Sequence, residues 1–181
     1  AFIIFREQVG FMKINIADIK HTPSEMLEFR LCEELDPAAY GYGEFTLPEQ
    51  VVCQGRIRDN HQGGFVAEGT YQGTAGLICS RCGRGFLLPV SGDFSTLFAP
   101  LQGEDWSGEA SMYPLQGDTA DIGEVLVSEI FFSLPMQPLC QENCQGLCPV
   151  CGADLNEESC SCRRDDIDPR WEKLKNLRFD D

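Results

Sequence analysis

The chain has 181 residues and an ordinary apolar fraction of 43%, enough for one globular domain or for a body with a small appended module. Its formal net charge of -15 disfavours a protein that coats nucleic acid generally, because phosphate contacts need a basic surface. Any RNA contact must therefore use a local basic patch, and the acidity also suits a basic protein partner. No apolar run is long enough to span a bilayer, so we expect no membrane partner.

The first eleven residues are expected to lie outside the fold. Met12-Lys13 is a more natural start, so residues 1–11 read as upstream sequence. Their apolar stretch is too short for a signal-peptide core. With ten cysteines and no recognisable export signal, the sequence predicts a reducing compartment, the cytoplasm.

Alternating apolar residues predict β-structure over the first half of the chain. Short strands are expected over residues 12–19 and 26–35, followed by a turn-rich stretch. A meander of longer strands is expected over residues 51–98, with a turn at 59–64. The packing this favours is an antiparallel sheet, strongly curled or partly closed into a barrel.

A covering helix is predicted after the meander. Residues 99–118 are rich in Gly, Pro and acidic residues and suggest a surface loop. Asp121 and Glu124 then provide an N-cap and a capping box, and apolar residues follow at helical spacing until Pro135 ends the helix. The apolar face of this helix should cover the sheet.

The predicted fold class is therefore α+β, mainly β, in two parts. Residues 12–139 are expected to form the β body with the covering helix. Residues 140–181 are expected to form a cysteine-rich zinc-binding module with a short last helix, which Asp168 would cap and Pro169 would begin.

Eight of the ten cysteines fall into close pairs typical of four-thiolate metal sites. The knuckle Cys148-Pro149-Val150-Cys151-Gly152 turns two thiolates toward one point, and its glycine permits the sharp return of the backbone. Cys79-Ser80-Arg81-Cys82-Gly83 repeats this pattern. Two sites, and so one or two Zn(II) ions per chain, are expected. Their ligands would be Cys148, Cys151, Cys160 and Cys162 for one, and Cys79, Cys82, Cys140 and Cys144 for the other.

A disulfide framework and an iron–sulfur cluster are the alternatives for these cysteines. The chain length, the lack of a signal peptide and the knuckle spacing favour metal over disulfides. Cys32 and Cys53 lie outside both groups in alternating apolar contexts, which predicts that both are small buried residues.

Four segments carry a family likeness. They are Cys79–Phe86, the stretch Leu134–Cys140, the run Gly146–Gly152 with Leu155-Asn156-Glu157, and Asp168-Pro169-Arg170-Trp171. In combination they resemble the YceD family, a bacterial and plastid group of large ribosomal RNA subunit accumulation proteins. The resemblance runs from about Met12 to Leu177. It implies a role in 23S ribosomal RNA accumulation, hence in large-subunit biogenesis, in the bacterial cytoplasm, with the C-terminal cysteine set stabilising the structure.

The first functional hypothesis is a non-enzymatic assembly factor. Closed four-thiolate sites leave no open position for water or a small-molecule substrate. The partners would be ribosomal RNA or large-subunit assembly intermediates, reached directly or through a basic ribosomal protein. Candidate phosphate contacts are Arg81, Arg84, Arg163, Arg164, Arg170, Lys173, Lys175 and Arg178. The competing interpretation of each is a solvated charge balanced by neighbouring acidic residues.

The second hypothesis is a thiol oxidoreductase or redox switch that uses the C-x-x-C pairs. No βαβ pattern flanks either pair, and a glycine directly after the second cysteine is more typical of metal knuckles. A zinc hydrolase is disfavoured because catalytic zinc usually takes His or carboxylate ligands. The two histidines, His21 and His61, lie in turn-like contexts far from the cysteines.

Overall fold

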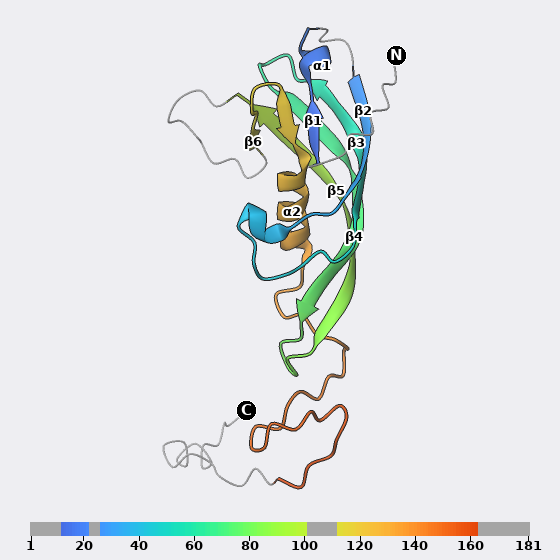
Figure 1. The fold of residues 1–181 in the computed structure, drawn as a ribbon, viewed down its shortest axis with the longest axis vertical. Helices are drawn as coiled ribbons and strands as arrows, with labels where there is room; N and C mark the ends of the chain where they lie inside the picture. Colours follow the sequence, from blue (N-terminus) through green and yellow to red (C-terminus); the bar gives the residue numbers. More distant parts are fainter. Residues whose placement is uncertain (1–11, 22–25, 101–111, 163–181) are drawn as a thin grey trace, which may run out of the picture.

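The computed structural model describes residues 12–21, 26–100 and 112–162, and the fold in these ranges is mainly β (Figure 1). The strands are β1 (Lys13–Asn15), β2 (Met26–Glu33), β3 (Val51–Asp59), β4 (Phe65–Ile78), β5 (Gly85–Ala99), β6 (Met112–Pro114) and β7 (Thr119–Asp121). The helices are α1 (Ala17–His21), the 3-10 turn η1 (Pro37–Tyr40) and α2 (Ile122–Ser133). Residues 1–11 and the predicted last helix lie outside the described residues.

Five strands form one mixed sheet in the order β2-β3-β4-β5-β6, while β1 and β7 form a separate antiparallel pair. The meander from β2 to β5 is antiparallel, as the alternation predicts. The last strand differs, because β6 runs parallel to β5 and pairs Leu97 with Met112. The prediction of a wholly antiparallel sheet is therefore wrong at this edge, and part of the expected surface loop is a strand.

The sheet also stays open instead of closing into a barrel, because β2 and β6 share no pairing within the described ranges. Helix α2 packs on one face of the sheet, the face that would line the interior if the sheet closed into a barrel (Figure 1). Its fully buried side chains join one core cluster with Phe94 and Phe98 of β5. These helical residues are Ile122, Val125, Leu126, Val127 and Ile130. Burying each such side chain contributes about 1.5–3 kcal/mol, so the helix and sheet stabilise each other.

The predicted limits of the covering helix are confirmed. The Asp121 side chain accepts a hydrogen bond from the Glu124 backbone N–H at 3.3 Å, which satisfies one of the free donors of the first turn. Asp121 also lies 3.4 Å from Lys13 Nζ, which joins the start of the helix to β1. Leu134 leaves the helix with extended backbone, as a residue before proline should.

The prediction of a strand over residues 12–19 is wrong in its second half. Strand β1 ends at Asn15, and α1 begins at Ala17. The Asn15 side-chain oxygen accepts a hydrogen bond from the Ala17 N–H at 2.9 Å, which satisfies one of the free donors at the start of this short helix. The apolar residues Ile16 and Ile19 are both buried in this conformation.

Cys32 and Cys53, the two cysteines outside the predicted metal sites, differ in their burial. Cys53 is fully buried, as predicted. Cys32 is exposed, which contradicts the prediction, because it follows the buried Leu31 on β2 and so points to the opposite face of the sheet. Its Sγ lies 3.2 Å from Oε1 of Gln50.

Strands β3 and β4 approach each other very closely at the facing pair Gly55–Gly69. A Cβ on Gly55 would lie 2.4 Å from the Glu68 carbonyl oxygen, and one on Gly69 would lie 2.3 Å from that of Gln54. Only glycine fits at these two positions.

The hairpin of β4 and β5 forms an arm that extends beyond both β3 and α2 (Figure 1). Strand β3 pairs with β4 only as far as Gln72, whereas β4 and β5 stay paired to Ile78 and Gly85. The arm therefore carries residues 79–84, the first knuckle, to a point away from the main core.

Candidate metal centres

The first knuckle closes the tip of the β4–β5 arm. The Cys79 N–H donates to the Arg84 carbonyl oxygen at 2.8 Å, and the Gly83 N–H donates to the Cys79 carbonyl oxygen at 2.9 Å. Gly83 has φ 71, in the left-handed region that favours glycine. This turn brings Cys79 and Cys82 to the same side of the tip.

The second knuckle repeats these hydrogen bonds. The Cys148 N–H donates to the Ala153 carbonyl oxygen at 2.8 Å, and the Gly152 N–H donates to the Cys148 carbonyl oxygen at 2.8 Å. Gly152 has φ 75, close to that of its counterpart. The local sequence C-x-x-C-G thus folds in the same way in two unrelated surroundings.

Four cysteines gather at the tip of the arm and form what we call the hairpin cluster: Cys79, Cys82, Cys140 and Cys144. Their sulfur atoms all lie within 4.8 Å of one another. The pairs Cys79–Cys144 and Cys82–Cys140 are each 3.7 Å apart. Sulfurs about 2.3 Å from a tetrahedral zinc would be about 3.8 Å apart, whereas disulfide sulfurs are about 2.05 Å apart. The spacing therefore fits four ligands of one ion and not two disulfides.

The other four form the tail cluster: Cys148, Cys151, Cys160 and Cys162. Their sulfurs also lie within 4.8 Å of one another. Cys148 is buried, whereas Cys151 and Cys162 are exposed. All ten cysteines, which lie within the described ranges, are free thiols.

The thiols of the hairpin cluster have opposite pKa shifts. The backbone N–H of Cys140 donates to Cys79 and lowers the pKa of that thiol to about 6. Burial, followed by the neighbouring thiols, raises the pKa of Cys140 to about 12. The cluster therefore accepts a first negative charge easily and resists further ones unless a cation is bound.

The tail cluster has the same asymmetry. Backbone N–H groups, that of Cys151 first, lower the pKa of the Cys148 thiol to about 6. A hydrogen bond with the Cys151 thiol, followed by burial, raises the pKa of Cys162 to about 12. Each cluster thus provides four sulfur donors whose negative charge a cation would balance. Either cluster could hold a metal ion.

These are the two groupings that the cysteine spacing suggests. That these eight residues bind metal stays a prediction, and so does the identity of the ion as zinc.

The two described arginines among the candidate RNA contacts make contacts inside the protein. Arg81 Nη1 donates to the Cys144 carbonyl oxygen at 2.9 Å. Arg84 Nη2 lies 2.9 Å from Asp154 Oδ2 and 2.5 Å from Glu157 Oε1. Both therefore connect the tip of the arm to the segment that follows Cys140. The remaining candidates lie outside the described residues: Arg163, Arg164, Arg170, Lys173, Lys175 and Arg178.

Asn156 has a structural role that sequence reasoning missed. Its Nδ2 donates to the Cys144 sulfur at 3.5 Å, and its Oδ1 accepts from the Gln145 N–H at 2.8 Å. The Asp154 side chain accepts from the Asn156 N–H at 2.9 Å, a hydrogen bond across two residues that is common in Asp-x-Asn sequences. That local pattern was the available signal for an ordered turn.

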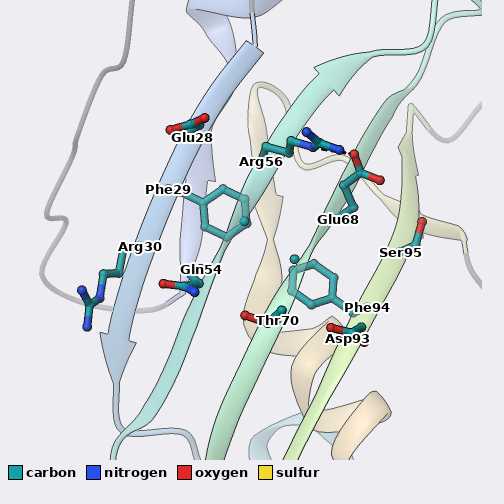
Figure 2. A pocket seen from close by; sticks show the side chains of 12 residues that line it. Glu28, Phe29, Arg30, Gln54, Arg56, Glu68, Thr70, Asp93, Phe94 and Ser95 are labelled. Atoms are coloured by element: carbon teal, nitrogen blue, oxygen red, sulfur yellow. Dashed lines mark hydrogen bonds and ion pairs between the residues drawn. The ribbon is translucent and has the colours of Figure 1, made fainter.

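Away from the cysteines, the polar face of the sheet is concave, and a hollow of about 820 Å³ opens over β2 to β5 (Figure 2). Arg56 Nε donates to Glu68 Oε1 at 2.6 Å between β3 and β4, toward one end of the hollow, and Arg30 and Asp93 lie at opposite sides (Figure 2). The hollow lies over the close glycine pair described above. Its lining mixes both signs of charge and includes neither histidine nor cysteine.

Comparison with known proteins gives the following matches. A family model described as "Large ribosomal RNA subunit accumulation protein YceD" matches residues 67–178, a range that includes all eight clustered cysteines. An uncharacterized protein of Mycobacterium tuberculosis is 26% identical over 173 residues, which cover 92% of this chain and 81% of that protein. In Arabidopsis thaliana, the chloroplast protein named large ribosomal RNA subunit accumulation protein YCED homolog 1 is 30% identical over 74 residues, 41% of this chain and 23% of its own length.

No solved structure matches the chain. None of the helices in the described ranges is long and apolar enough to cross a membrane.

Proposed function

Because the chain belongs to the YceD family of large ribosomal RNA subunit accumulation proteins, we propose that it supports accumulation of 23S ribosomal RNA and so biogenesis of the large ribosomal subunit. It acts as a non-enzymatic factor in the bacterial cytoplasm. The name of the Arabidopsis relative is consistent with this role.

Zinc held by the two clusters is the structural part of the proposal. The observation that carries it is the 3.7 Å spacing of sulfurs in the hairpin cluster, which matches the edge of a four-thiolate tetrahedron. Four protein ligands would leave no open position on either ion, so the metal would hold the arm and the following segment together and would not activate a substrate.

The charges of the described surface favour contact with a basic protein over direct phosphate contact by the body. Of the seven Lys and Arg side chains in the described ranges, Lys13, Lys20, Arg56 and Arg84 each lie within ion-pair distance of a carboxylate. Side chains neutralised in this way offer little to a phosphate backbone. A basic ribosomal protein within an assembly intermediate is therefore the partner that this surface suits, with the basic residues after Cys162 as the candidates for RNA.

A thiol redox switch is the second candidate function, and the lowered pKa values of Cys79 and Cys148 are the observation in its favour. However, the close sulfur contacts in the hairpin cluster join each knuckle cysteine to Cys140 or Cys144. Each knuckle cysteine thus contacts a sulfur from outside its own pair as well as its partner in the pair, which fits four ligands of one ion.

The test is complementation in a bacterium whose own family member has been deleted. The wild-type chain should restore 23S ribosomal RNA to parental levels, and protein purified without added metal should contain two zinc ions. A Cys79→Ser, Cys82→Ser variant should lose zinc and complement poorly. Normal 23S levels in the deletion strain, or activity that responds to thiol oxidants while metal content stays constant, would contradict the proposal.

A further inference from the structure

The loop between the second and third cysteines of the tail cluster, residues 152–159, contacts the other cluster. Its two ends are Cys151 and Cys160, whose sulfurs belong to the tail cluster. A metal ion on those sulfurs would therefore fix both ends of the loop. The middle of the loop carries side chains that reach the hairpin cluster.

Asn156 is the first of these connections. Its Nδ2 donates to the sulfur of Cys144, a member of the hairpin cluster. Its Oδ1 accepts from the Gln145 N–H at 2.8 Å and from Gln141 Nε2 at 3.0 Å. Asn156 thus holds the backbone beside Cys144 and donates a hydrogen bond to that sulfur, as outer partners of metal ligands commonly do.

Arg84 is the second connection. It follows the knuckle Cys79–Gly83, and its carbonyl oxygen accepts the hydrogen bond from the Cys79 N–H that shapes the knuckle. Its guanidinium is held by Asp154 and Glu157 of the loop. The loop therefore contacts both halves of the hairpin cluster, the knuckle through Arg84 and Cys144 through Asn156.

The backbone provides a third connection. The Leu155 N–H donates to the Gly146 carbonyl oxygen at 2.9 Å, and Leu147 pairs with Asp154 in an isolated bridge. Gly146 lies against Arg81, since a Cβ added there would meet the Arg81 carbonyl oxygen at 3.1 Å. The two clusters are thus joined by packed and hydrogen-bonded groups without a flexible spacer.

From these contacts we propose that the two clusters bind metal as a coupled pair, with Asn156 and Arg84 as the positioning residues that transmit the coupling. Occupation of the tail cluster orders residues 152–159, and the ordered loop orients Cys144 and the knuckle for the ion of the hairpin cluster. Coupling between two binding sites is reciprocal, so each ion strengthens the binding of the other. This inference rests on the proposed function, because it requires that both clusters bind metal.

The two sets of cysteine ligands differ in exposure, and this difference predicts which metal ion a chelator removes first. Cys151 and Cys162 are exposed, whereas Cys79, Cys82 and Cys144 are buried. A chelator therefore reaches the tail cluster first, and removal of that ion loosens the loop that supports the hairpin cluster. The second ion should then leave faster than it does from a chain whose loop is intact.

The experiment measures release of zinc from the full chain to a chromophoric chelator in excess, with metal content determined beforehand. In the wild type we expect two ions per chain. Asn156→Ala should speed release of the slower ion by about 10–100-fold, the usual effect of removing an outer partner of a metal ligand. Arg84→Gln should act in the same direction. Glu158→Gln is the matched control, because Glu158 belongs to the same loop and no side-chain contact from it to the hairpin cluster is present within the described ranges.

A Cys79→Ser, Cys82→Ser variant tests the coupling independently, because in the wild type the tail ion leaves while the hairpin ion is still bound. The variant should retain one ion, released faster than the fast ion of the wild type, since coupling is reciprocal. Two ions in the wild type together with unchanged release rates in all of these variants would overturn the coupling and leave the proposed function intact. A wild-type chain that binds no metal would overturn both. If the double cysteine variant fails to fold, the comparison of Asn156→Ala with Glu158→Gln decides the question.

Discussion

Arg84 and Asp154 stand seventy residues apart in sequence, and their side chains meet at 2.9 Å. This ion pair joins the tip of the β4–β5 arm to the loop of the tail cluster. The Arg84 side chain is 46% exposed and that of Asp154 is 22% exposed, so water weakens the attraction.

The first prediction follows from that exposure. Replacing Arg84 by Gln should lower the free energy of unfolding by no more than about 1 kcal/mol, and the loss should shrink at high salt. Denaturant unfolding at low and high ionic strength measures both effects. A loss several times larger, unaffected by salt, would mean that Arg84 acts through packing instead.

The second prediction concerns metal removal. The buried cysteines of the hairpin cluster pack with Leu139 outside the main core around Phe94 and Ile122, and Phe86 contacts both groups. A strong chelator should therefore expose residues 140–162 while the sheet and α2 stay folded. Hydrogen exchange should show protection lost in that segment and kept in β3 and α2. Simultaneous loss of protection throughout would instead indicate one cooperative unit.

The third prediction tests the close glycine pair. Gly69→Ala places a Cβ 2.3 Å from the Gln54 carbonyl oxygen and 3.0 Å from the Phe94 ring, so backbone atoms must move. We expect a loss of about 1–3 kcal/mol or more in the free energy of unfolding. Gly85→Ala is the control within the same sheet, because the nearest atom to its Cβ is 4.0 Å away. Equal effects of the two substitutions would show that steric crowding is not the cause.

The fourth prediction concerns thiol reactivity. Burial raises the pKa of Cys53 to about 12, so this thiol stays protonated at neutral pH and out of contact with reagents. Cys32 is exposed and should be alkylated rapidly in the folded, zinc-loaded protein. Mass spectrometry after brief treatment with iodoacetamide should find Cys32 modified and Cys53 unmodified until denaturant is added. Early modification of Cys53 would contradict its burial.

Features encoded locally could be predicted from the sequence. Both C-x-x-C-G knuckles are set by a few adjacent residues, because Gly83 and Gly152 supply the left-handed backbone conformation at the turn. The limits of α2 are also set by adjacent residues, because Asp121 caps its first turn and Pro135 follows its end.

Features that depend on contacts between distant residues could not be predicted from the sequence. Strand β6 has three residues, too few for alternation to be recognised, and exists through pairing with Leu97 and its neighbours. The contact between Asn156 and Cys144 needs the tail loop folded against the hairpin cluster. Cys32 was misassigned because one residue of register decides which face a strand side chain takes.

The hairpin cluster has a further consequence for how the chain folds. Cys82 and Cys140 are 58 positions apart, and the chain between them includes β5, β6, β7 and α2. Bringing the ends of a loop of this size together costs a free chain ~4 kcal/mol of chain entropy. Because a four-thiolate site of this kind rarely exists in an unfolded chain, binding of the ion would be linked to folding of the segments between these cysteines.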